Sequence, residues 1–145
     1  MEYKNPIPTV DIIIERGNEI VLVVRAITPF KEKFVLPGGH VEYNETVEEA
    51  AIREAEEETG LKIKLIDILG VYSDPKRDPR AHRISTAFVA KIVSGELNAG
   101  TDAKKAIFYD PKKVKKEEIG FDHFLMIEDY LKYKEQKQTY WSTRR

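Results

Sequence analysis

The residues of this chain best suited to chemistry are glutamates on a segment that should form a helix. At about 100° of rotation per helical residue, the side expected to face the core is marked by Val47, Ala50 and Ala51. Glu54 and Glu58 fall in the middle of that side, one turn apart, and Glu57 flanks it. Carboxylates are rarely buried without partners, and like charges at this spacing repel one another. A divalent cation is the natural partner, because carboxylates are hard oxygen ligands of the kind that Mg²⁺ accepts.

The alternative interpretation is an acidic helix face in water. It accounts for Glu48, Glu49 and Glu56, which lie on the opposite side of the same wheel. It does not account for Glu54 and Glu58. The wheel therefore favours a metal site on the inward side.

The helix that carries these glutamates has clear ends in the sequence. Thr46 and Glu49 form a capping box at its start. Gly60 is the matching stop, so the sequence predicts a helix over 46–59.

Apolar runs predict a sheet beside this helix. Val10–Ile14 and Ile20–Arg25 are separated by a short link that contains glycine, which indicates a hairpin. Further strands are expected at 34–36, which ends at the breaker Pro37-Gly38-Gly39, and at 61–72, 84–93 and 106–109. Other helices are expected from Pro111 to 119 and, capped by Asp122, from 122 to 134, with a polar tail beyond. This mixture predicts an α/β (α+β) sandwich, with the sheet between helices.

Composition limits the class of protein. The chain has 145 residues, which suits a single domain over 1–145. A net charge of −1 argues against a bulk nucleic-acid binder and against a polybasic membrane clamp. The absence of cysteine excludes disulfides and thiolate metal sites, and the apolar runs are too short to span a bilayer. We therefore expect a soluble, cytoplasmic protein.

One motif covers the glutamate helix and the loop before it. Residues 39–61 carry a fixed set spaced as Gly39, Glu45, Arg53, Glu54, Glu57, Glu58 and Gly60. This set resembles the complete Nudix box, and the preceding 34–38 resembles the usual lead-in. The resemblance implies a Nudix fold, an α/β/α sandwich around a mixed β-sheet. It also implies hydrolysis of a nucleoside diphosphate linked to another group, with Mg²⁺ or Mn²⁺ as cofactor.

The resemblance assigns roles by position. Glu54 and Glu58 would ligate the metal directly, with the backbone carbonyl of Gly38 as a further ligand. Glu57 would bind through water or hold a second ion. The residues expected to serve catalysis are Arg53, Glu54, Glu57 and Glu58, with Arg53 orienting the glutamates. Structural support would come from Glu45 and Gly60.

A basic loop outside the box is the feature of the sequence that bears on the choice of substrate. The segment 72–83 holds three arginines, a lysine and a histidine, and arginine forks suit phosphate oxygens. Pro75 lies fifteen residues beyond Gly60, a spacing associated with ADP-ribose pyrophosphatases in this family. The residues expected to bind substrate are Arg25, Arg77, Arg80 and Gly39. The alternative is that the Asp-Pro pairs only make turns and the arginines pair with aspartates.

The expected reaction converts ADP-ribose and water into AMP and ribose 5-phosphate. A rival within the family is a nucleotide-sanitising pyrophosphohydrolase acting on oxidised dGTP or similar triphosphates. A rival of another class is an inactive Nudix domain that binds a nucleotide as a sensor. The partner would be a small-molecule substrate, with no stable nucleic acid and no membrane, and family members are often homodimers. The general base is unassigned, the candidates being Glu54, Glu96, Asp102, Glu117 and Glu118.

Overall fold

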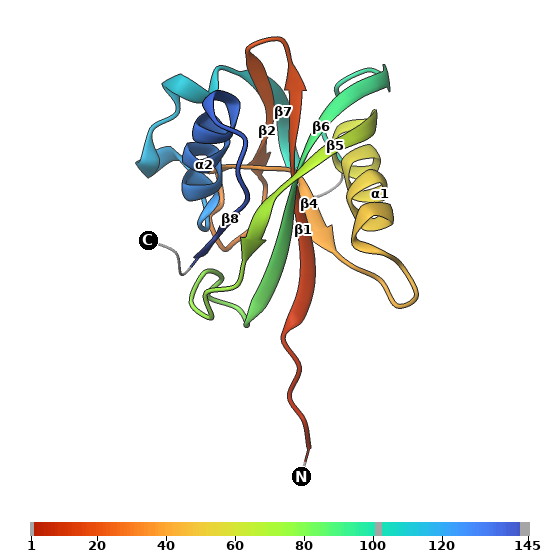
Figure 1. Cartoon of the computed structure of the whole chain (residues 1–145), viewed down its shortest axis with the longest axis vertical. Coiled ribbons are helices and arrows are strands. Elements are labelled where there is room, and N and C mark those ends of the chain that lie inside the picture. The colour runs from red at the N-terminus through yellow and green to blue at the C-terminus, as the bar shows by residue number, and fades with distance from the viewer. Residues whose placement is uncertain (1, 101–102, 143–145) are drawn as a thin grey trace.

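A mixed β-sheet with one α-helix on each face forms the body of the molecule. The computed structural model describes residues 2–100 and 103–142, and within them the sheet has eight strands (Figure 1). The strands are β1 Ile7–Arg16, β2 Glu19–Arg25, β3 Phe34–Val35, β4 Gly38–His40, β5 Leu61–Tyr72, β6 Arg83–Gly95, β7 Ala103–Tyr109 and β8 Tyr140–Trp141. The helices are α1 Val47–Thr59 and α2 His123–Glu135, with short 3-10 turns η1 Pro111–Lys113 and η2 Lys116–Glu118.

The strand order is β3-β2-β1-β6-β5-β8, with β4 also pairing with β1 and β7 with β2. The pairs β1–β6 and β5–β8 are parallel and the others are antiparallel. Helix α1 packs on β5, β4 and β1, while α2 lies across the opposite face (Figure 1). The expected α/β/α sandwich around a mixed sheet is confirmed.

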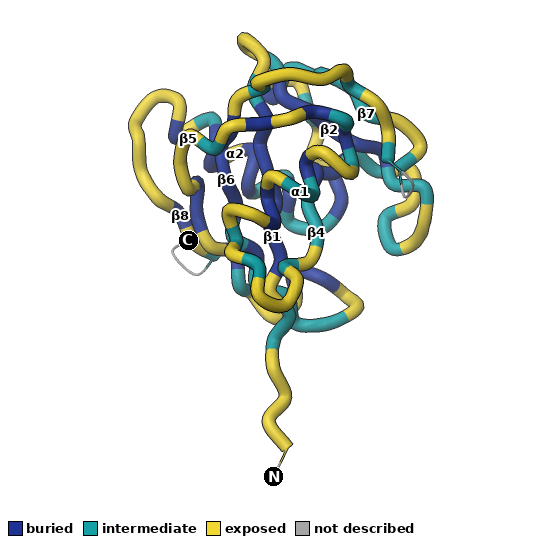
Figure 2. Tube along the Cα trace, turned by 90° about the vertical axis from the view of Figure 1, so that its right-hand side faces the viewer, coloured by how far each residue is buried: buried dark blue, intermediate teal, exposed yellow. Residues whose placement is uncertain are grey.

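Strand β1 runs through the centre of the molecule and is buried on both faces (Figure 2). Successive side chains of a strand point to opposite faces. Ile12 and Ile14 accordingly pack on the α1 side with Ala50, whereas Ile13 packs on the α2 side with Met126. This burial fixes the β1 backbone, against which the candidate site is built.

Helix α1 begins and ends as its sequence predicts. The Thr46 hydroxyl accepts a hydrogen bond from the Glu49 amide at 3.1 Å, and the Glu49 carboxylate accepts one from the Thr46 amide at 2.9 Å. Gly60 adopts the left-handed conformation with φ of 76°, and its amide donates to the Glu56 carbonyl at 2.9 Å. The first hairpin and strands β5 and β6 are also confirmed, with bulges along β5.

The chain does break after β3, as expected at Pro37, but Gly38–His40 then forms the short strand β4 against β1, which was not expected. A Cβ on Gly38 would lie 2.2 Å from the Val10 carbonyl oxygen, so only glycine allows the two backbones to come this close. The glycines that looked like a stop therefore make a close strand contact. Strand β7 also begins earlier than expected, at Ala103.

Three expectations for the C-terminal third are corrected. The helix expected from Pro111 is two separate 3-10 turns, since Val114 between them is extended and packs against the core. Asp122 precedes α2 but makes no side-chain cap, because its carboxylate accepts two hydrogen bonds from Arg77 instead. The polar tail contains strand β8, whose Tyr140 pairs with Gly70 of β5. A two-residue strand is too short to show a periodic pattern.

No helix in the described part of the chain is long and apolar enough to cross a membrane.

Candidate active site

A cavity of about 350 Å³ opens beside the centre of β1 and lies in the size range of small-molecule sites. Its lining comes from β1, the ends of β2 and β3, strand β4, helix α1, the 73–82 loop and the start of α2. Segments far apart in the sequence therefore meet at one place.

Carboxylates from α1 form one wall of the cavity. Glu54, Glu57 and Glu58 all line it, together with Gly38 and Gly39. The Glu54 side chain is only 14% exposed, and burial raises its pKa above the usual range although Arg53 opposes the shift. A Glu58 oxygen accepts a hydrogen bond from the Gly38 amide at 3.3 Å, which joins the helix to β4.

Gly39 gives the Glu54 carboxylate its place. A Cβ built on Gly39 would lie 2.3 Å from Cδ of Glu54 and 2.5 Å from each carboxylate oxygen. Such distances are far inside ordinary contact. The carboxylate consequently rests directly on the β4 backbone.

Arg53 lies behind this wall and holds it. Its guanidinium donates to Glu45 twice, at 2.7 and 2.9 Å, and to Glu54 at 2.8 Å and Glu57 at 3.2 Å. It also reaches the His40 carbonyl at 2.9 Å, so it ties α1 to β4. The hydrogen bonds from Arg53, with the one from the Glu42 amide, lower the pKa of Glu45 to about 2. The orienting role of Arg53 and the supporting role of Glu45 stay predictions, for which these contacts supply the geometry.

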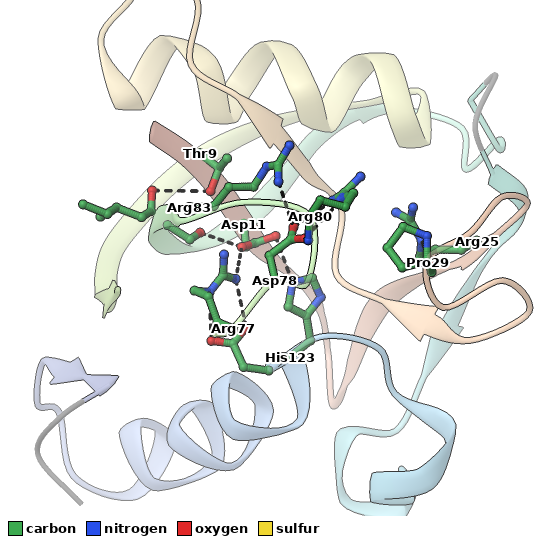
Figure 3. A network of polar contacts seen from close by, with 12 residues as sticks. Thr9, Asp11, Arg25, Pro29, Arg77, Asp78, Arg80, Arg83 and His123 are labelled. Atoms are coloured by element: carbon green, nitrogen blue, oxygen red, sulfur yellow. Dashed lines mark hydrogen bonds and ion pairs between the residues drawn. The ribbon is translucent and has the colours of Figure 1, made fainter. Parts of the chain in front are cut away.

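Arginines from other elements form a second wall of the cavity. Arg25 at the end of β2, Arg77 and Arg80 in the loop, and Arg83 at the start of β6 all line the cavity (Figure 3). Arg25 donates from Nε to the Pro29 carbonyl at 2.6 Å. The three arginines predicted to bind substrate therefore do lie at the cavity, and Arg83 joins them.

Arg77 is largely committed to carboxylates. Its side chain is 4% exposed, donates to both oxygens of Asp122 at 2.8 and 2.9 Å, and lies 3.5 Å from Asp11. Burial lowers its pKa, but the two aspartates outweigh burial and the net shift is upward. For this residue, the alternative of arginine–aspartate pairing describes what the structure contains.

A buried polar cluster under the cavity was not anticipated. Asp11 of β1 accepts a hydrogen bond from Ser85 at 2.5 Å, and its other oxygen lies 3.3 Å from Nε2 of His123. Nδ1 of His123 accepts a hydrogen bond from the Leu36 amide at 3.0 Å, so the ring supports the segment leading into β4. The available signal was an aspartate inside the otherwise apolar run Val10–Ile14.

Phe121 is a second residue that sequence reasoning missed. It lines the cavity, has φ of 52°, and lies 5.1 Å from the Arg25 guanidinium and 5.4 Å from that of Arg80. A left-handed φ is uncommon outside glycine and is often found at functional sites. Periodicity in the sequence carries no trace of it.

Burial and the nearby arginines both act on the pKa of His40. Burial lowers the pKa of His40, and the nearby Arg83 and Arg80 lower it further. The cavity therefore has an acidic side on α1 and a positively charged side on the loop.

Most candidates for a general base in the later loops lie elsewhere. Glu96, Glu117 and Glu118 do not line the cavity, and Asp102 lies outside the described residues. Over 2–100 and 103–142, no three acidic or histidine side chains already stand close enough together to hold a metal ion. The metal ligands and the base therefore stay predictions.

Comparison with known proteins decides the family. The family model described as the NUDIX domain matches residues 5–130, which is most of the chain. The chain belongs to the Nudix family. This confirms the resemblance seen in the 39–61 motif and the expectation of a hydrolase.

Individual relatives agree with this assignment. An ADP-ribose pyrophosphatase of Methanocaldococcus jannaschii is 52% identical over 91% of this chain and 77% of its own length. A crystal structure of a NUDIX hydrolase from Nitrosomonas europaea has a TM-score of 0.81 and 26% identity, covering 97% of this chain and 78% of that one. A bifunctional NMN adenylyltransferase/ADP ribose pyrophosphatase from Francisella tularensis, complexed with AMP and a Mn ion, has a TM-score of 0.76 and 29% identity. This Nudix chain is covered to 91% in that match but spans only 43% of the Francisella chain.

Proposed function

We propose that this Nudix hydrolase cleaves ADP-ribose with water into AMP and ribose 5-phosphate, using Mg²⁺ or Mn²⁺. The observation that carries the proposal is the two-sided cavity, with three carboxylates on one wall and arginines on the other. A diphosphate held between them would meet cations along its length and metal ligands at its scissile bond.

The donor types on the acidic wall suit a hard divalent cation, on which the three carboxylates would have to converge. Its side-chain donors are the carboxylates of Glu54, Glu57 and Glu58, the Gly38 carbonyl would add a fourth oxygen, and oxygen is the ligand type that Mg²⁺ prefers. When bound, the ion would neutralise the diphosphate, lower the pKa of a bound water and stabilise the leaving group.

Residues of the chain would position the metal ligands and the diphosphate. Arg53 fixes Glu54 and Glu57 through hydrogen bonds of 2.8 and 3.2 Å, so that the acidic wall is ordered before substrate arrives. Arg25 and Arg80 would bind diphosphate oxygens from the second wall, and the backbone at Gly39, which lines the cavity, would approach the same group. Among the described candidates for the general base, the largely buried Glu54 lines the cavity, and burial raises its pKa.

The choice of ADP-ribose is supported by the Methanocaldococcus relative and by the pyrophosphatase activity in the name of the Francisella protein. Each name describes that protein. The homodimer and the cytoplasmic location expected from the sequence belong to the same proposal, and size-exclusion chromatography with light scattering tests the homodimer.

A substrate panel with Mg²⁺ and chromatographic identification of products tests the reaction. The panel holds ADP-ribose, NADH, a dinucleoside polyphosphate, dGTP and oxidised dGTP. Selective conversion of ADP-ribose to AMP and ribose 5-phosphate is the expected result, with Glu58→Gln as the variant that loses it. Pyrophosphate release from a triphosphate would instead establish the nucleotide-sanitising activity. No turnover, with ligand binding retained in Glu58→Gln, would establish the sensor.

A further inference from the structure

Arg83 is a buried cation that the fold does not fully satisfy. It is the first residue of β6, its side chain is 13% exposed, and it lines the cavity. Within the part of the chain that the structure describes, its Nη1 is buried and has no hydrogen-bond partner. Buried polar atoms in native proteins nearly always have partners, so this one requires an explanation.

The nearest acceptor is already taken. Asp78 is 4% exposed, and its carboxylate accepts hydrogen bonds from Nε and Nη2 of Arg80 at 3.0 and 2.8 Å. Nη1 of Arg83 lies 3.5 Å from the same carboxylate, which is too long for a hydrogen bond (Figure 3). Two guanidinium groups therefore share one carboxylate, and a positive charge is left over at the cavity wall.

Arg77 shows the contrasting case a few residues away. Its side chain is buried more deeply, at 4% exposed, but two aspartates accept from it or lie close to it, so its charge is balanced inside the protein. Because two carboxylates already neutralise Arg77, it has little positive charge to offer a ligand. The excess positive charge and the buried donor atom without a partner both belong to Arg83.

We propose that Arg83, rather than Arg77, is the arginine of this segment that binds the substrate, and that its guanidinium turns in the cavity wall so that Nη1, buried in the structure, donates to a non-bridging oxygen of the substrate diphosphate. This inference rests on the proposed function, since it names a residue that binds the diphosphate in the same cavity. A phosphate oxygen supplies both the missing acceptor and the missing negative charge. Asp78 holds Arg80 by two bonds and keeps the Arg83 side chain close beside it, so the basic wall is formed before the anion arrives.

The test is Arg83→Met, which keeps the buried stem and removes the charge. A bond made to the diphosphate in both ground and transition states appears in KM rather than kcat. We expect KM for ADP-ribose to rise roughly 10- to 100-fold, with kcat within threefold of wild type. The melting temperature should stay at or above that of wild type, because the variant removes a buried donor without a partner.

Two further arginines serve as matched controls. Arg77→Met should lower the melting temperature markedly, because it leaves Asp11 and Asp122 unbalanced. Arg16→Met removes a half-exposed arginine that pairs with Glu19 outside the cavity and should leave KM unchanged. A KM for Arg83→Met within twofold of wild type would overturn the proposal. A fall in melting temperature as large as that of Arg77→Met would also overturn it, since Arg83 would then be a structural residue.

Binding of inorganic pyrophosphate tests the role of Arg83 separately from the proposed hydrolysis of ADP-ribose. Calorimetry on the metal-free protein needs no turnover, and Arg83→Met should bind pyrophosphate at least tenfold more weakly than wild type and Arg16→Met. If wild type fails to hydrolyse ADP-ribose but this difference appears, the proposed reaction is wrong and the role of Arg83 stands. Equal pyrophosphate binding by wild type and Arg83→Met refutes the role of Arg83 whichever substrate is hydrolysed.

Discussion

Gly39→Ala should disable the site while leaving the fold in place. The added Cβ would lie 2.3 Å from Cδ of Glu54 and within 2.5 Å of both carboxylate oxygens. Ordinary carbon–carbon contact begins near 3.5 Å, so the carboxylate must retreat by about 1 Å. The obstructed group is the far end of a flexible side chain, which can turn toward solvent at little cost in folding free energy.

The size of the effect follows from that displacement. A misplacement of about 1 Å in a catalytic constellation can cost on the order of 100-fold in rate. The free energy of unfolding should change by less than about 1 kcal/mol, because alanine also lowers the entropy of the unfolded chain. The expected outcome is therefore a kcat about 100-fold lower with nearly unchanged thermal unfolding.

The assay is steady-state hydrolysis of ADP-ribose with a Mg²⁺ titration, run beside calorimetric unfolding. Gly38→Ala is the informative neighbour, since its Cβ would lie 2.2 Å from the Val10 carbonyl oxygen. Backbone cannot move aside as a side chain can, so this variant should lose about 2 kcal/mol or more of stability. Gly17→Ala, in the β1–β2 turn at φ of 58° with open space around it, should cost about 1 kcal/mol and leave activity intact.

One result would refute the reasoning. If Gly39→Ala keeps wild-type kcat and the wild-type Mg²⁺ dependence, the position of the Glu54 carboxylate against β4 does not matter for catalysis. Loss of activity in Gly39→Ala through unfolding at the assay temperature would equally contradict the claim that the clash is absorbed by a side chain.

Three further predictions concern charge. Saturating Mg²⁺ should stabilise wild type by about 2.7 kcal/mol at 100 times Kd, and Glu54→Gln should lose most of that gain without lowering the metal-free melting temperature. Burial raises the pKa of Asp11, but His123, Arg77 and Ser85 outweigh it and the net pKa is lowered. Its stabilising contribution is therefore complete above the unfolded pKa near 3.9 and is lost as pH falls through the lower folded value. Asp11→Asn should cost about 3 kcal/mol at pH 7 and flatten the decline in stability below pH 4, as measured by denaturant unfolding across pH. Arg53→Lys, which cannot reproduce the forked hydrogen bonds, should lower kcat about tenfold or more with a smaller change in KM; equal kcat would exclude an orienting role.

Much of the acidic wall was readable from the sequence, because its determinants are local. Helical periodicity places Glu54 and Glu58 on one side of α1, and the caps at Thr46 and Gly60 are set by residues within one turn. The family motif lies within the same continuous stretch. The apolar runs likewise predicted the central strands and hence the sandwich.

The basic wall shows where local reasoning stops. The sequence pointed to an arginine-rich loop, but it could not show which of Arg77, Arg80 and Arg83 pair with aspartates and which can bind substrate. That division depends on Asp11 and Asp122, which come from distant elements and neutralise Arg77 while leaving Arg83 short of an acceptor.

What the sequence by itself determined was therefore the helix with its inward carboxylates, the order of most strands and the family to which the chain belongs. Only the tertiary structure decided which charges are balanced, which glycines permit close contact and which buried donor remains open. Periodicity and capping depend on neighbours a few residues away, whereas ion pairing and close packing depend on groups brought together by the sheet. The pairing of Gly38 with Asp11 in adjacent strands is one such contact, and no spacing along the chain encodes it.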